Sequence, residues 1–167
     1  MTDDDLCALY EAQARPLWAY VLRMTRDPGA ADDIVQEAFL RVYEARVLTD
    51  SNADHRRRYL YTVATNLVRH RCRRQREGVQ TEDLELTASD ADPIQGLAVR
   101  QALDALPIVE RQALWLSYAE RYSSREIAQM LGYREGSLRQ VLVRARRRFI
   151  ERFGRALNPE DHGVDGR

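Results

Sequence analysis

The sequence contains no apolar run that approaches the ~20 residues needed for a membrane-spanning helix. Its N-terminus, MTDDDLCALY, is acidic and lacks the basic start and apolar stretch of a secretory signal. We therefore expect a cytoplasmic protein without membrane insertion. No segment alternates apolar and polar residues in the two-residue period of a β-strand, so the sequence predicts no strands.

Residues that could carry out chemistry are also scarce. Cys7 and Cys72 are the two cysteines and there are three histidines, whereas a zinc site needs three or four ligands. We expect no metal and no cofactor. Cys72 lies among arginines, which could make it redox-sensitive, and an inert, partly buried cysteine is the alternative. The chain shows no Ser/His/Asp set, no carboxylates clustered with histidine and no phosphate-binding glycine loop, which indicates that it is not an enzyme.

Charge is segregated along the chain although its total is zero. The 167 residues include 26 acidic and 26 basic side chains, and every basic one is arginine. Residues 55–76 hold 8 bases and no acids, and residues 111–155 hold 11 bases and 4 acids. Acidic side chains dominate residues 1–54 and 77–110. Two separate basic blocks indicate two contacts with a polyanion such as nucleic acid.

Apolar residues recur at helical spacing through most of the chain. We expect a first helix that ends near the turn Asp27-Pro28-Gly29 and a second helix over residues 32–43. A third follows, with Asp54 as its N-cap, and exposes Thr62, Thr65 and several arginines. Two more helices, over 94–106 and 108–120, precede the C-terminal motif.

These expectations give an all-α fold class. Residues 78–93 are acidic and lack helical periodicity, which is typical of a linker. The predicted organisation is two small helical domains joined by an acidic linker: residues 1–76, the linker at 77–93, a second domain at 94–155, and a polar tail at 156–167.

Residues 123–149, SSREIAQMLGYREGSLRQVLVRARRRF, have the pattern of a helix-turn-helix. Gly132 ends the first helix, where a left-handed residue is needed and glycine has no Cβ to clash. Trp115 and Tyr118 are predicted to pack against this motif. The second helix of such a motif enters the major groove of DNA. Its apolar face turns inward, and the face predicted to contact DNA carries Arg139, Gln140, Val143, Arg144, Arg147 and Arg148.

The side chains of this face suit different parts of DNA. Arg139 and Arg144 can each donate two hydrogen bonds to a guanine, and Gln140 suits adenine. Val143 can contact a thymine methyl group, with simple surface exposure as the alternative. Arg147 and Arg148 are predicted to hold phosphates, which position a protein without specifying sequence.

Three segments together resemble bacterial sigma factors of the extracytoplasmic function (ECF) group, the smallest members of the sigma-70 family. ADDIVQEAFLRVYEAR (31–46) resembles region 2.2, which grips the clamp helices of core RNA polymerase. YLYTVATNLVRHRCRR (59–74) resembles regions 2.3 and 2.4, which open and read the −10 promoter element. Residues 102–149 resemble region 4, which reads the −35 element, and the three segments follow the family's order.

The resemblance implies a protein that binds core RNA polymerase, recognises promoter DNA and promotes its opening. The partners that the resemblance implies are core RNA polymerase, promoter DNA and an anti-sigma factor. Asn66 would hold an unpaired −10 base, with an aromatic ring from Tyr61 rather than Tyr59, and Arg69 and Arg73 would follow the DNA backbone. The residues expected to contact polymerase fall within two turns of the second helix: Asp33, Gln36, Glu37, Leu40 and Arg41.

Other interpretations stay open at this point. An autonomous helix-turn-helix regulator that binds an operator without polymerase would explain the C-terminal motif, but not the patch at 33–41 or the second basic block. Asn66 could be structural, and the 33–41 patch could be an ordinary solvated helix face. The acidic linker could imitate RNA in the exit path of the polymerase or serve as a soluble tether.

Overall fold

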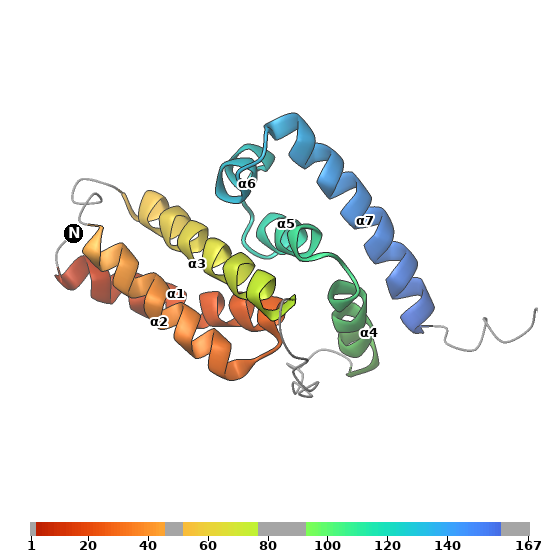
Figure 1. The fold of residues 1–167 in the computed structure, drawn as a ribbon, viewed down its shortest axis with the longest axis horizontal. Coiled ribbons are helices and arrows are strands. Elements are labelled where there is room, and N and C mark those ends of the chain that lie inside the picture. Colours follow the sequence, from red (N-terminus) through yellow and green to blue (C-terminus); the bar gives the residue numbers. More distant parts are fainter. Residues whose placement is uncertain (1–2, 46–51, 77–92, 158–167) are drawn as a thin grey trace, which may run out of the picture. The chain divides into compact units, whose positions relative to one another are not determined.

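The protein is described by a computed structural model over residues 3–45, 52–76 and 93–157, and no strand occurs in these ranges (Figure 1). The all-α prediction is therefore confirmed. The predicted linker lies almost wholly outside the described residues, and the domain boundaries stay a prediction. The helices are α1 (Asp3–Thr25), α2 (Pro28–Glu44), α3 (Ala53–Arg76), α4 (Pro93–Asp104), α5 (Ile108–Tyr118), α6 (Ser124–Leu131) and α7 (Glu135–Leu157).

The first three helices form one compact unit in which each helix packs against the other two (Figure 1). Each helix carries apolar residues three and four positions apart, so each has one stripe to bury. Burying these stripes removes apolar surface from water, which is the main force holding the unit together. The fully or almost fully buried side chains include Leu17, Tyr20 and Val21 of α1, Ala31, Ala38 and Val42 of α2, and Leu60, Ala64 and Val68 of α3.

Two helix starts differ from the sequence expectation. α2 begins at Pro28 rather than residue 32, because Asp27 is its N-cap and accepts a hydrogen bond from the Ala30 amide at 3.1 Å. Proline suits the first helical position, where no amide hydrogen is needed. α3 is capped by Asn52, whose Oδ1 accepts from the His55 amide at 2.9 Å, so the prediction of Asp54 as the cap is wrong.

The second unit contains α4, α5 and α7, and α7 packs against both of the other helices (Figure 1). Pro107 separates α4 from α5, as predicted, and occupies the N-cap position of α5. Arg111 lies buried at this corner and donates hydrogen bonds to the carbonyl oxygens of Leu103, Asp104 and Leu106 at 2.9–3.1 Å. Its guanidinium thus supplies donors to carbonyl groups at the C-terminal end of α4 and just beyond it, where the helix no longer continues.

α6, a turn and α7 follow one another as a helix-turn-helix requires. Ser123 Oγ accepts from the Glu126 amide, while Glu126 Oε2 accepts from the Ser123 amide at 2.9 Å, which is a capping box. Gly132 has φ +71°, and the Tyr133 amide donates back to the Ala128 carbonyl oxygen at 2.8 Å. The left-handed turn predicted at Gly132 is therefore confirmed, and it directs the chain into α7.

Candidate nucleic-acid and polymerase interfaces

The face of α7 predicted to contact DNA is exposed along its length. Arg139, Gln140, Arg144 and Arg147 are all exposed, and the Val143 side chain, at 62% exposure, is the one apolar group among them. The opposite face is closed, since it buries Leu138, Val141, Leu142 and Ala145. The exposed face therefore offers guanidinium, amide and apolar groups together, which is the set that distinguishes base pairs in the major groove.

Two arginines on this face form ion pairs within α7 itself. Arg139 Nη2 lies 2.5 Å from Glu135 Oε1, and Arg147 Nε lies 4.0 Å from Glu151 Oε1. All four side chains are more than two-fifths exposed, so water screens both pairs and each contributes little to stability. Neither pair prevents its arginine from turning to DNA.

Arg148 differs from its neighbours on α7. Its Nη1 lies 2.7 Å from Oε1 of Glu110 on α5, and the Glu110 side chain is only 7% exposed. Arg146 also reaches α5, because its Nε donates to the Tyr118 hydroxyl at 2.8 Å and its guanidinium lies over the Tyr118 ring. Tyr118 thus contacts the helix-turn-helix as predicted. Arg148 therefore has an internal partner, Glu110, that competes with the phosphate contact predicted for it.

α3 presents a mixed picture for the predicted −10 contacts. Asn66 and Arg73 are exposed and Arg69 is half-buried. Tyr61, however, is completely buried. Its ring packs 5.7 Å from that of Tyr20, and the Arg57 guanidinium lies 5.2 Å from its centre. Tyr61 is therefore a core residue of the first unit, and its prediction as an exposed ring for a −10 base is wrong.

Only one of the two tyrosines near the start of α3 can be exposed, and the sequence does not show which. Tyr59 and Tyr61 are two positions apart and cannot share one helix face, and it is Tyr59 that is partly exposed. Thr65 is likewise buried rather than on the arginine-bearing side, and its hydroxyl shares a 2.8 Å hydrogen bond with that of Tyr20. Both residues contact Tyr20 of α1, which lies about 40 or more residues earlier in the sequence. The helical periodicity of α3 gives no signal of a contact between residues so far apart.

The patch predicted for polymerase contact lies on one exposed face of α2. Asp33, Gln36, Glu37, Leu40 and Arg41 are all exposed, and Glu37 and Arg41 pair at 2.6 Å. The Leu40 side chain is 55% exposed and lies beside these polar groups. An apolar centre with a charged rim is typical of a protein–protein contact.

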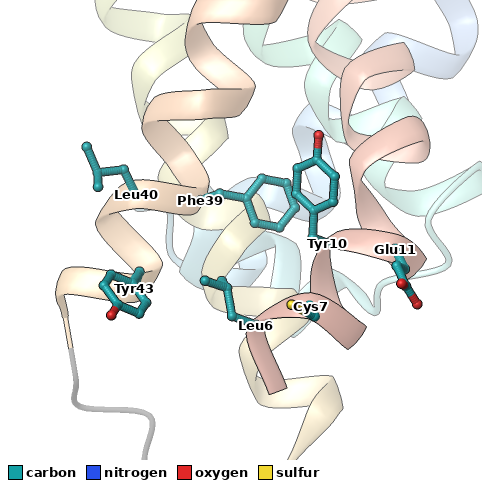
Figure 2. A pocket seen from close by; sticks show the side chains of 7 residues that line it. All are labelled: Leu6, Cys7, Tyr10, Glu11, Phe39, Leu40 and Tyr43. Carbon is teal, nitrogen blue, oxygen red and sulfur yellow. The ribbon is translucent and has the colours of Figure 1, made fainter. Parts of the chain in front are cut away.

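A hollow beside Leu40 extends this patch onto α1, and the sequence reasoning did not identify it (Figure 2). It has a volume of about 460 Å³. Its wall includes the Tyr10 and Phe39 rings, with centres 5.0 Å apart, and Tyr43. Tyr10 is 56% and Tyr43 47% exposed. The sequence does carry a signal for this hollow. Leu6–Tyr10 and Phe39–Tyr43 are pairs at i,i+4 spacing, which places apolar groups next to one another on the surface of each helix.

A second apolar groove, of about 470 Å³, was also missed and lies within the second unit. It is formed by α4, α5 and α7, with exposed apolar side chains at Tyr118 and Ile150. Its remaining walls are formed by Val99, Leu103, Leu114, Trp115, Ala119, Arg146 and Phe149.

Features of other protein classes do not emerge from the described part of the chain. Within residues 3–45, 52–76 and 93–157, no group of three or more His, Cys, Asp or Glu side chains is placed to hold a metal ion. No helix in those ranges is long and apolar enough to cross a membrane. Cys7 is exposed and Cys72 half-buried, and the redox sensitivity of Cys72 stays a prediction.

The chain matches two protein-family models. The model described as Sigma-70 region 2 matches residues 9–78, and the model described as Sigma-70, region 4 matches residues 96–149. Together the two matches span most of the described helices, and each falls on one of the two basic blocks.

Curated relatives cover nearly the whole chain. It is 33% identical over 158 residues to the ECF RNA polymerase sigma factor SigL of Mycobacterium tuberculosis, covering 88% of this chain and 89% of that protein. It is 26% identical over 170 residues to the ECF RNA polymerase sigma factor SigM of Bacillus subtilis, covering 96% of this chain and all of that protein.

A solved structure shares the fold. The sigma factor RpoE of Bartonella quintana, determined in complex with the anti-sigma factor NepR, superimposes with a TM-score of 0.72. The match covers 90% of this chain and 95% of that one at 22% sequence identity. At that identity the likeness concerns the fold alone.

Proposed function

The chain belongs to the ECF group of the sigma-70 family, and we propose that it binds core RNA polymerase through α2, reads −35 DNA with α7 and captures an unpaired −10 base with α3. Promoter opening for transcription initiation is the outcome. The protein carries out no catalysis of its own in this scheme and acts where the polymerase acts, in the cytoplasm.

One observation carries the proposal: a single chain exposes both a patch of apolar and polar side chains on α2 and two arginine-bearing helices. On α2, Leu40 stands exposed between polar side chains of the same helix and the apolar hollow beside α1. On α7, Arg139 and Arg144 stand exposed over a closed apolar face. A regulator that binds an operator alone needs only the second of these surfaces.

The DNA contacts divide into two kinds. Arg139, Gln140, Val143 and Arg144 face the base edges of duplex DNA at the −35 element, and Arg147 contacts phosphate. Asn66, with Arg69 and Arg73 beside it, contacts the −10 strand once it is unpaired. The Asn66 amide can both donate to and accept from a base edge, but it has no charge with which to attract duplex DNA.

An anti-sigma factor is the further partner that we propose. The support is that the Bartonella sigma factor of the same fold was solved with one. The domain division belongs to the same scheme, with residues 1–76 as the polymerase and −10 domain, 94–155 as the −35 domain, 77–93 as a linker and 156–167 as a tail.

The direct test is transcription reconstituted from purified parts. Core RNA polymerase is mixed with the full chain and a library of random upstream sequences, and the transcripts are sequenced. We expect start sites to appear at one fixed distance downstream of a pair of enriched sequence elements. If the chain does not bind core polymerase, yet selects duplex sequences by itself, the operator-binding regulator is the correct interpretation.

A further inference from the structure

We propose that Glu110 is a positioning residue for −35 recognition: by holding Arg148 in an ion pair between α5 and α7, it fixes the orientation in which α7 presents Arg139 and Arg144 to DNA. The inference rests on the proposed function of α7. It assigns Arg148 an internal role in place of the phosphate contact that the sequence predicts.

The burial of Glu110 is the first observation behind this proposal. Its side chain is 7% exposed, and Arg148 Nη1 lies 2.7 Å from its Oε1. A carboxylate that is removed from water needs a partner of opposite charge, because burial without one is costly. Arg148 is 46% exposed and reaches back to supply that charge. Turning Arg148 outward to a phosphate would leave the buried carboxylate uncompensated.

The second observation is the kind of contact that holds α7 in place. Leu138, Val141, Leu142 and Ala145 are buried, but apolar contacts have no preferred direction. A charge-assisted hydrogen bond is short and directional. Rotating α7 by about 15° would move a group about 6 Å from its axis by about 1.5 Å, since the helix with its side chains is 10–12 Å wide. That displacement breaks the 2.7 Å hydrogen bond unless the Arg148 side chain leaves its present rotamer, so the bond opposes the rotation.

A second polar bridge joins the same two helices. Arg146 Nε donates to the Tyr118 hydroxyl at 2.8 Å. Two directional contacts from neighbouring positions of α7 to different turns of α5 restrain both rotation and sliding of α7. Arg148 also lies one helical turn beyond Arg144, on the same row of the helix surface. Glu110 therefore holds Arg148 one helical turn from Arg144, which is a predicted base contact. Its negative charge also offsets the repulsion between the guanidinium groups of Arg144 and Arg148.

The experiment measures binding of holoenzyme, reconstituted from core polymerase and the full chain, to duplex promoters that differ only in the −35 element. The readout is the ratio of affinities for the preferred and the altered −35 sequences. This ratio does not depend on the fraction of protein that is folded, so loss of stability alone leaves it unchanged. The dependence of affinity on salt is recorded in parallel.

We expect Glu110→Ala and Arg148→Ala each to lower the ratio by about 3- to 10-fold, with no further loss in the double variant, because the two residues act as one pair. Arg148→Lys keeps the charge and should retain most of the ratio. Arg147→Ala is the matched control from the adjacent, exposed position: it should weaken all sequences alike and reduce the salt slope by ~1.

The contrary results are equally distinct. If Glu110→Ala leaves the ratio at the wild-type value, or if Arg148→Ala behaves as Arg147→Ala is expected to behave, Arg148 holds phosphate and the inference is wrong. Glu110→Ala leaves no buried charge behind, so it decides the matter even if Arg148→Ala fails to fold. If the wild-type holoenzyme itself shows no −35 preference, the proposed function of α7 is at fault rather than the role of Glu110.

Discussion

α3 and α7 are the two long, arginine-rich helices of this protein, and their arginines have different partners. On α3, Arg56 pairs with Asp5 at 3.1 Å and Arg71 with Asp27 at 3.0 Å. These pairs join α3 to α1 and to the start of α2. On α7, Arg139 and Arg147 pair with glutamates of the same helix, and within the described part of the chain only Arg146 and Arg148 reach another helix, α5.

The difference shows that a basic block in a sequence overstates the surface available to DNA. Arg71 is tied to the residue that caps α2, so it serves the fold of the first unit. Arg144 stands exposed on α7, and its side chain has no hydrogen bond or ion pair to any other residue that the structure describes. Substituting an arginine that stabilises the fold should therefore lower the free energy of unfolding, whereas substituting an arginine that binds DNA should weaken DNA binding and leave stability almost unchanged.

The largest effect is expected at Arg111, which is buried and bonded to three carbonyl oxygens. Arg111→Ala should lower the free energy of unfolding by about 4 kcal/mol, because hydrogen bonds from charged donors contribute ~1.5–3 kcal/mol each and are not additive. Arg144→Ala should change it by less than about 0.5 kcal/mol. Urea titration of both variants measures this. Equal stabilities would show that the division between the two kinds of arginine is wrong.

The next effect concerns α2, whose patch should serve polymerase and not DNA. The double variant Asp33→Ala with Gln36→Ala should weaken assembly with core polymerase by about 1–4 kcal/mol if the two side chains anchor the interface. Arg144→Ala should assemble normally and serves as the control. A competition assay against a labelled sigma factor gives both affinities. Unchanged assembly of the double variant would remove this assignment.

On α7, base contacts and phosphate contacts should separate. Arg139→Ala should weaken −35 binding by roughly 1–3 kcal/mol and relax the preference at one base pair. Arg147→Ala should weaken every sequence to a similar extent. A panel of single-base −35 variants distinguishes the two patterns, and equal weakening by Arg139→Ala across the panel would make Arg139 a phosphate contact.

The smallest effect is expected at the buried contact between α3 and α1, the hydrogen bond that Thr65 shares with Tyr20. Tyr20→Phe removes the hydrogen bond to Thr65 and should lower the free energy of unfolding by about 1 kcal/mol. Thr65→Val should give a similar loss, and the double variant less than the sum. If Thr65→Val instead impairs promoter binding with stability intact, Thr65 faces DNA after all.

Much of this fold follows from local sequence patterns. Periodicity predicts the helices, and the left-handed turn at Gly132 follows from the absence of a side chain there. Asn52 and Asp27 were missed as caps because several polar residues near each helix start are equally suitable, and the choice is made by the path of the chain. The burial of Tyr61 depends on Tyr20, and the pairing of Arg148 depends on Glu110, 38 residues away. Contacts between residues so far apart leave no periodic signal.

The central claim, that α3 captures an unpaired base after α7 has engaged the duplex, is tested most directly by permanganate footprinting of one promoter with wild-type and Asn66→Ala holoenzyme. Asn66 is exposed and uncharged, so its loss should spare polymerase assembly and the closed complex while reducing the rate and extent of opening. A template already unpaired across the −10 element should restore activity only in part. Equal opening by the two proteins, in rate and extent, would contradict the account and make Asn66 a structural residue.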